Sequence, residues 1–206
     1  DIRFGARLES LRTKDGAVCG VTVRQDGAVY DLPARQVVLA LGHSARDTFE
    51  MLYQTGLAME QKPFAVGVRI EHRQSDINTA QYGAAAERLP AADYSLSCHL
   101  PDGSSAYTFC MCPGGFVVDA SSEPGRLAIN GMSNHDRAGA NANSALIVTV
   151  TPEDFPQPGT LGGVTFQRQL EEAAYRCGGG KIPVQLYGDF RENRSSTGFG
   201  AVTQQF

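Results

Sequence analysis

The 206-residue sequence lacks the features that would place it in several common classes of protein. No uninterrupted apolar run approaches the roughly 20 residues of a membrane-spanning helix, so we expect no contact with a membrane. No basic stretch followed by an apolar one marks a secretory leader. The net charge is −4, which argues against broad binding to nucleic acid.

Cysteine is scarce and odd in number. The five cysteines lie at scattered spacings, whereas a secreted disulfide framework is usually even in number and denser. We therefore expect a reducing, cytoplasmic environment. A structural zinc ion needs four suitably spaced donors, and although Cys98 and His99 could approach Cys110 and Cys112, we predict no metal site.

The first 60 residues read as β-structure followed by one helix. The sequences around Asp15-Gly16 and Asp26-Gly27 predict tight hairpin turns between strands. Residues 37–41, VVLAL, form a short continuous apolar run, which is typical of a parallel strand buried on both faces. Ser44 and Asp47 have the spacing of a capping box, so we expect a helix from Ser44 toward Gly56.

The remainder is predicted to be mainly antiparallel. Residues 64–72 alternate as a strand, and residues 73–93 suit a short helix or a loop. Four further strand candidates, separated by turns, are expected at residues 94–100, 105–112, 115–121 and 126–132. A polar loop spans residues 134–144, a buried strand residues 145–151, and a helix residues 165–177, ended by Gly178-Gly179-Gly180.

Several stretches carry a family resemblance across essentially the whole chain: LALGHSARDTFEML (residues 39–52), KPFAVGVRIEH (62–72), FCMCPGGFVV (109–118) and NGMSNHDRAGANANSALIVTVTPEDF (130–155). They resemble the bacterial predicted FAD-dependent dehydrogenases, also called NAD(FAD)-utilising dehydrogenases, of the two-dinucleotide-binding flavoprotein superfamily. The resemblance implies FAD as cofactor, with NAD(P)H as a candidate electron donor. It names no substrate.

The resemblance also implies a fold. We expect an α+β chain in which residues 1–60 form part of an FAD/NAD(P)-binding α/β lobe, with a β-meander and one buried parallel strand. Residues 61–190 would form an inserted, mainly antiparallel substrate lobe, and residues 191–206 a segment returning to the FAD lobe. The Gly-rich motif G-x-G-x-x-G is missing, so we expect an internal piece of a longer enzyme that by itself is inactive, binds FAD weakly or not at all, and self-associates.

Two glycine-containing turns are the predicted cofactor contacts. The resemblance places Ala40, Leu41, Gly42 and His43 beside the FAD. Pro113, Gly114 and Gly115 form the second turn, because glycine lets a backbone approach a flat ring closely.

The two cysteines before the second turn leave alternatives open. In a regular strand Cys110 and Cys112 would share one face, and a disulfide at this spacing would close a strained ring. They could exchange electrons with the flavin, or they could simply pack as small apolar side chains.

The densest polar stretch is the candidate substrate site. His135 could act as acid or base and Arg137 could hold a carboxylate, with Asn130, Asn141 and Asn143 as further substrate contacts. A solvated loop would have the same composition. Arg69, Glu71 and His72 are polar residues at the end of an apolar strand. Arg69 and Glu71 share one face of that strand, so they could pair with each other or line the same cleft.

These observations predict a piece of a cytoplasmic, bacterial FAD-dependent oxidoreductase that acts on a small molecule. The alternative is a non-catalytic ligand-binding or interaction domain on the same β-rich scaffold, which binds no flavin.

Overall fold

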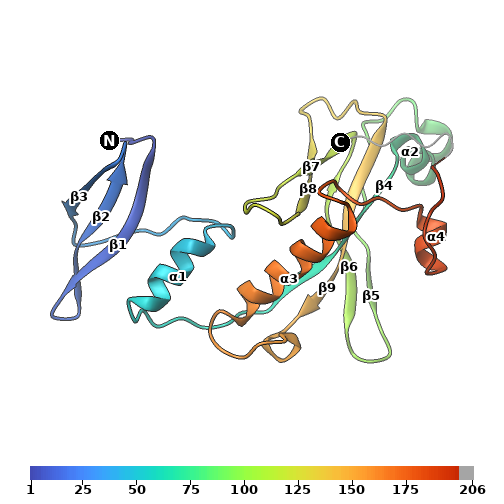
Figure 1. Ribbon diagram of the computed structural model, residues 1–206. Helices are drawn as coiled ribbons and strands as arrows, with labels where there is room; N and C mark the ends of the chain where they lie inside the picture. The colour runs from blue at the N-terminus through green and yellow to red at the C-terminus, as the bar shows by residue number, and fades with distance from the viewer. Residues whose placement is uncertain (200–206) are drawn as a thin grey trace. The chain divides into compact units, whose positions relative to one another are not determined.

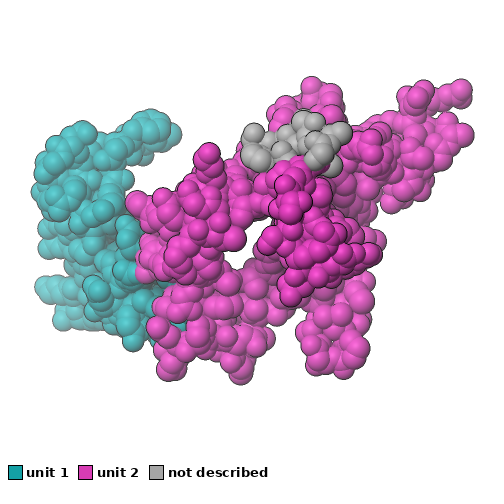
Figure 2. All heavy atoms as spheres, turned by 45° about the vertical axis from the view of Figure 1, so that its right-hand side comes forward, with its two compact units in different colours: residues 1–61, 159–164 teal, residues 62–158, 165–206 magenta. Residues whose placement is uncertain are grey.

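The computed structural model describes residues 1–199 and consists mostly of antiparallel sheets with a few helices (Figure 1). The chain divides into two compact units (Figure 2). Unit 1 comprises residues 1–61 and 159–164, and unit 2 comprises residues 62–158 and 165–206. The FAD lobe, substrate lobe and return segment expected from sequence stay predictions, and the return segment, residues 191–206, extends beyond the described residues.

Unit 1 contains a three-stranded antiparallel sheet and one helix. The sheet has the order β1 (Ala6–Lys14), β2 (Ala17–Gln25), β3 (Ala28–Pro33), and the helix is α1 (Arg46–Gln54). Asp15 and Gly16 have φ of 52° and 77°, and Asp26 and Gly27 have φ of 50° and 82°. Two successive positive φ values fit the type I′ turns that match strand twist, so both predicted hairpins are confirmed.

The buried parallel strand predicted at residues 37–41 is wrong. These residues form no strand in the described chain, and Val38 is 89% exposed. A strand needs a neighbour that pairs with its backbone, and within residues 1–199 the sheet of unit 1 ends at β3, which pairs only with β2. The apolar composition of this run is therefore not enough to make it a strand.

The start of α1 also differs from the prediction. Ala45, rather than Ser44, is the N-cap residue, and no side chain caps the helix. Ser44 Oγ instead lies 3.3 Å from His43 Nε2. The helix ends before Gly56, as expected, and Gly56 has φ of 78°.

Unit 2 is organised around a four-stranded antiparallel sheet with the order β4 (Phe64–Arg73), β9 (Asn141–Val150), β6 (Ser105–Cys112), β5 (Ser97–His99). The pair formed by β4 and β9 is long and regular, running from Phe64 opposite Val150 to Arg73 opposite Asn141. These two strands are therefore adjacent in space although a long stretch of sequence separates them.

A separate two-stranded sheet joins β7 (Gly115–Asp119) and β8 (Ile129–Ser133). The remaining elements are α2 (Gln74–Tyr82), η1 (Gly83–Ala85), η2 (Pro152–Asp154), α3 (Gly162–Cys177) and α4 (Tyr187–Arg191). The expected strands at residues 94–100, 105–112, 115–121 and 126–132 are confirmed as elements. They do not form one meander, because β5 and β6 pair in the four-stranded sheet whereas β7 and β8 form the separate two-stranded sheet.

The polar loop predicted at residues 134–144 ends earlier than expected. Asn141, Ala142, Asn143 and Ser144 belong to β9 and are buried, the last three of them fully. Most of their polar atoms have partners on β4 and β6: Asn141 donates to Glu71, Asn143 Oδ1 accepts from Arg69, and Ser144 Oγ donates to Phe109 O. Asn143 Nδ2 is the exception, since it is buried without a partner among the described residues. Asn141 and Asn143 are thus strand residues rather than loop residues.

An ion-pair network attaches α3 to the segment before β8. Arg126 contacts Glu123 at 3.0 Å and Glu172 at 2.9 Å, and Arg168 contacts Glu123 at 2.7 Å. Beside the start of β4, the rings of Phe64, Phe155 and Phe166 pack together with centroids 5.2 to 6.2 Å apart. Charged and aromatic contacts therefore position the part of α3 that belongs to unit 2, from Thr165 onward.

Candidate functional site

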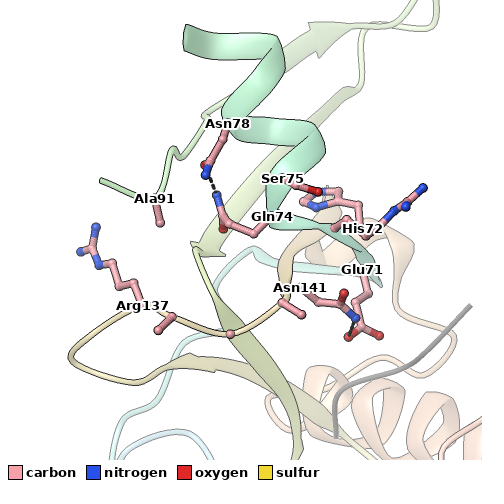
Figure 3. A pocket seen from close by; sticks show the side chains of 12 residues that line it. Glu71, His72, Gln74, Ser75, Asn78, Ala91, Arg137 and Asn141 are labelled. Atoms are coloured by element: carbon pink, nitrogen blue, oxygen red, sulfur yellow. Dashed lines mark hydrogen bonds between the residues drawn. The ribbon is translucent and has the colours of Figure 1, made fainter. Parts of the chain in front are cut away.

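The candidate site is a cleft of about 840 Å³ within unit 2, where β4 passes into α2 (Figure 3). Its walls come from the β4–α2 junction, from the loop that leads into β9, and from residues near position 91. The lining residues are Glu71, His72, Arg73, Gln74, Ser75, Asn78, Ala91, Arg137, Ala138, Gly139, Ala140 and Asn141. The wall exposes more apolar than polar surface, and charged and amide side chains stand within it. The cleft therefore suits a small molecule that has both apolar and polar parts.

Gln74, the first residue of α2, holds the walls together. Its side chain is buried, and its Nε2 donates to Ala92 O at 2.9 Å and to Asn78 Oδ1 at 2.8 Å. Its Oε1 accepts a hydrogen bond of 2.7 Å from the Gly114 backbone N–H. The Gln74 backbone N–H donates to Ala140 O at 2.9 Å, so one residue ties four segments together.

Gly114 is closed off by the chain's own backbone. Gly114 has φ of 54°, and a Cβ placed there would lie 1.9 Å from Arg137 O. The Gly139 N–H also donates to Gly114 O at 3.1 Å. Pro113, Gly114 and Gly115 are all buried. The close approach that these glycines allow is therefore made by residues 137–139.

The carboxylate of Glu71, which lines the cleft, accepts a hydrogen bond from Asn141. Asn141, only 7% exposed, donates from Nδ2 to Glu71 Oε1 at 2.8 Å, and Figure 3 shows the two side chains meeting. Asn141 and Arg137, two predicted substrate contacts, are thereby brought to the same cleft. Glu71 lines it too, as one of the two alternatives from sequence allowed, and His72 is a further lining residue.

His72 is hydrogen-bonded to Tyr94, with 2.7 Å between Nε2 and the phenol oxygen. Burial lowers the pKa of His72 below its usual value, while Asp76 and Glu71 oppose this effect. Burial likewise raises the pKa of Tyr94, which a hydrogen bond from Ser144 partly offsets. Both shifts favour the neutral forms, so the pair forms an uncharged part of the site.

A second polar cluster is centred on the side chain of Arg69 and contains Asn130 and Asn143, two of the predicted substrate contacts. Its Nη1 donates to Asn143 Oδ1 at 2.6 Å and to Cys110 O at 3.3 Å, and its Nη2 donates to Asn130 Oδ1 at 3.3 Å. Gly131 makes room for the cluster, since a Cβ there would lie 2.2 Å from Asn143 Oδ1. Asn130 and Asn143 thus bind Arg69 and do not line the cleft.

The two cysteines do not share one environment. A register shift between Phe109 and Cys112, with φ of 47° at Cys110, interrupts the strand alternation on which the shared-face expectation rested. Cys110 is exposed, whereas Cys112 is buried and its thiol donates to Cys110 O at 3.2 Å. Burial raises the pKa of Cys112, and the charge of Arg69 only partly offsets this.

His135 lies apart from the cleft. It is exposed on the loop between β8 and β9 and is not among the cleft-lining residues. Sequence reasoning also missed Gln74, Ser75 and Asn78, because a polar stretch at the start of a short helix looks the same whether it faces water or a cleft. Only the packing of α2 against residues 137–141 distinguishes the two.

The predicted FAD contacts differ in how well they fit a cofactor. Gly42 and His43 are exposed, and Gly42 has φ of 66°. Apart from Gly42 and its two chain neighbours, no described residue has a heavy atom within 4 Å of where a Cβ on Gly42 would be. This backbone is open to a ligand. The space beside Gly114 is instead filled by Arg137 and Gly139. Residues 40–43 therefore fit a cofactor contact, and the turn at residues 113–115 does not offer one as it stands.

Residues 1–199 lack two further kinds of feature. None of the helices there is long and apolar enough to cross a membrane. Within the same residues, no group of three or more His, Cys, Asp or Glu side chains is arranged to hold a metal ion.

Comparison with known proteins places the chain in a family. A protein of Clostridium beijerinckii, named only as an uncharacterized protein, is 47% identical over 211 residues. The alignment takes in 100% of this chain but only 39% of that relative, so the chain spans well under half the length of the curated protein that it matches. The family model for FAD-dependent protein, C-terminal domain-like, matches residues 63–206. Because this match covers most of the chain, the chain belongs to the family of FAD-dependent proteins with this C-terminal domain.

Proposed function

We propose that this chain is the substrate-binding part of a cytoplasmic, bacterial FAD-dependent oxidoreductase that acts on a small molecule. The observation that carries the proposal is the cleft of about 840 Å³ with charged and amide side chains in its wall, which lies within the residues that the FAD-dependent family model matches. When bound, FAD would supply the hydride or electron transfer. The residues of the cleft would bind and orient the substrate.

The proposal assigns separate tasks to the two units. In unit 1, the open backbone of residues 40–43 would contact the cofactor, because nothing in the described chain fills the space at Gly42. In unit 2, Arg137, Asn141 and Glu71 would contact the substrate. NAD(P)H is the proposed electron donor. His135 is proposed as an acid or base and the thiols of Cys110 and Cys112 as electron carriers, although all three residues lie outside the cleft.

The test uses the natural full-length protein that contains this chain. We expect it to purify with bound FAD, seen as visible flavin absorbance, and to lose that absorbance on anaerobic addition of NADH or NADPH. A protein without flavin would support the non-catalytic binding domain instead. A flavin that dithionite reduces but neither nicotinamide does would remove only the proposed donor.

A matched pair of variants tests the cofactor contact. Gly42→Ala and Gly16→Ala both place a Cβ at a positive φ in open space, so their strain is similar. Only Gly42→Ala is expected to lower the flavin content of the purified protein. Equal flavin content in the two variants would exclude residues 40–43 from the cofactor site.

The thiols can be tested in the same protein. Cys110→Ser should leave folding unchanged because Cys110 is exposed. If Cys110 exchanges electrons with the flavin, this variant will show slower flavin reduction. An unchanged rate in Cys110→Ser and in the double variant with Cys112→Ser would assign both cysteines to packing.

A further inference from the structure

We propose that the cleft takes a small molecule bearing a carboxylate, and that Arg137 is the ion-pair partner of that carboxylate. The inference rests on the proposed function, because it names the chemical class of the substrate. It can nevertheless be tested by binding alone, with no flavin chemistry involved.

The charges around the cleft single out Arg137. Arg73 lies 3.4 Å from the carboxylate of Asp76, and Glu71 is engaged by Asn141. Among residues 1–199, no carboxylate lies within ion-pairing distance of the Arg137 guanidinium, although it borders the cleft. A guanidinium beside this cleft and without a counter-charge is suited to a bidentate carboxylate.

The backbone of Arg137 is held firmly by its neighbours. Its carbonyl packs against Gly114, so closely that a Cβ on Gly114 would overlap it. The Arg137 N–H donates to Asn134 O at 3.1 Å, and Gly139 N–H donates to Gly114 O at 3.1 Å. An anchored Cα fixes the point from which the Arg137 side chain extends, so the backbone loses little further entropy when a ligand binds.

The opposite side of the cleft carries different chemistry. Figure 3 shows Arg137 well separated from Glu71 and Asn141, while Gln74, Ser75 and Asn78 project from α2. The carboxylate of Glu71 disfavours a second negative charge near it. The cleft is therefore suited to one carboxylate at the Arg137 end and to an uncharged group at the Glu71 end.

The experiment measures binding to the natural full-length protein by isothermal titration calorimetry. Three carboxylates, benzoate, cinnamate and octanoate, are each compared with the corresponding amide. We expect at least one acid to bind and its amide to bind at least about tenfold more weakly, since a charged hydrogen-bonded pair is lost. The absence of a preference for the acid in all three pairs would overturn the proposal.

Variants place the binding at Arg137. Arg137→Gln should weaken binding of the preferred acid about tenfold or more, and Arg137→Lys should weaken it less, because the charge remains. The matched control is Arg73→Gln, whose guanidinium already has Asp76 as partner. An Arg137→Gln protein that binds the acid as the wild type does would refute the assignment.

The outcomes separate the inference from the proposed function. A protein that binds carboxylates through Arg137 but holds no flavin would contradict the oxidoreductase proposal alone. A flavoprotein that NADH reduces but that shows no carboxylate preference would contradict the inference alone.

Discussion

Gly42 and Gly114 carry the same sequence signal and have opposite surroundings. Both lie in turns that follow apolar stretches, and both have positive φ, 66° and 54°. Around Gly42, no described residue other than its two chain neighbours has a heavy atom within 4 Å of the position that a Cβ would take. At Gly114 that position lies 1.9 Å from Arg137 O. One glycine leaves its backbone open, and the other is packed under residues of its own chain.

The difference shows that a glycine turn has two distinct physical causes. A positive φ favours glycine at both positions. At Gly114 a second requirement is added, because the backbone of residues 137–139 needs the space that a side chain would occupy. The turn at residues 113–115 therefore shapes the cleft by holding Arg137 in place, and the turn at residues 40–43 stays available to a ligand.

The largest expected effect comes from Gly114→Ala. The added Cβ would overlap backbone atoms that cannot move without disturbing the Gly114–Gly139 contact, so we expect a loss of about 4 kcal/mol in the free energy of unfolding. Gly42→Ala should cost only about 1 kcal/mol, since it adds strain in φ without a clash. Urea denaturation of both variants measures the contrast, and equal losses would show that the two glycines do not differ.

Gln74→Leu should have the next largest effect. The substitution leaves the Gly114 N–H and Ala92 O without their side-chain partner, at a cost of about 3 kcal/mol. Gln81→Leu, on the exposed face of the same helix, is the control and should change stability by no more than about 0.5 kcal/mol.

Hydrogen exchange sharpens the Gln74 test. The Gly114 amide should exchange faster in Gln74→Leu than in the wild type, because its acceptor is gone. If exchange at Gly114 is unchanged while stability falls, Gln74 acts through packing rather than by holding the closed turn.

The smallest expected effect is the pH dependence of stability, which tests whether the His72 side chain is withdrawn from water in the folded protein. The pKa of His72 is lowered in the folded protein from its ordinary value of 6.5. Below this value the unfolded chain binds a proton more readily than the folded one, so His72 reduces stability as pH falls and has no such effect above it. The wild type should therefore lose more stability than His72→Gln between about pH 7.5 and 5.5. Parallel losses in urea titrations at both pH values would mean that His72 is not desolvated.

Local signals in the sequence predicted the elements that depend on neighbouring residues. The Asp-Gly pairs at 15–16 and 26–27 set their turns through backbone conformation alone. The helix expected at residues 165–177 forms, starting at Gly162. The predictions were wrong where pairing with a segment distant in the sequence decides whether residues form a strand or a loop. Residues 37–41 have the composition of a strand but pair with no strand in the described chain. Asn141 and Asn143 look like loop residues until β4 supplies Glu71 and Arg69 as partners.

The candidate site divides in the same way. Sequence alone pointed to Arg137, Asn141 and Glu71 as polar residues beside apolar strands, because charge and amide groups at strand ends stand out from their surroundings. It could not show that Arg137 and Asn141 line a cleft while His135 does not, nor that Gln74 joins its walls. Those facts depend on contacts between residues far apart in the chain, and only the tertiary structure determines which of them form.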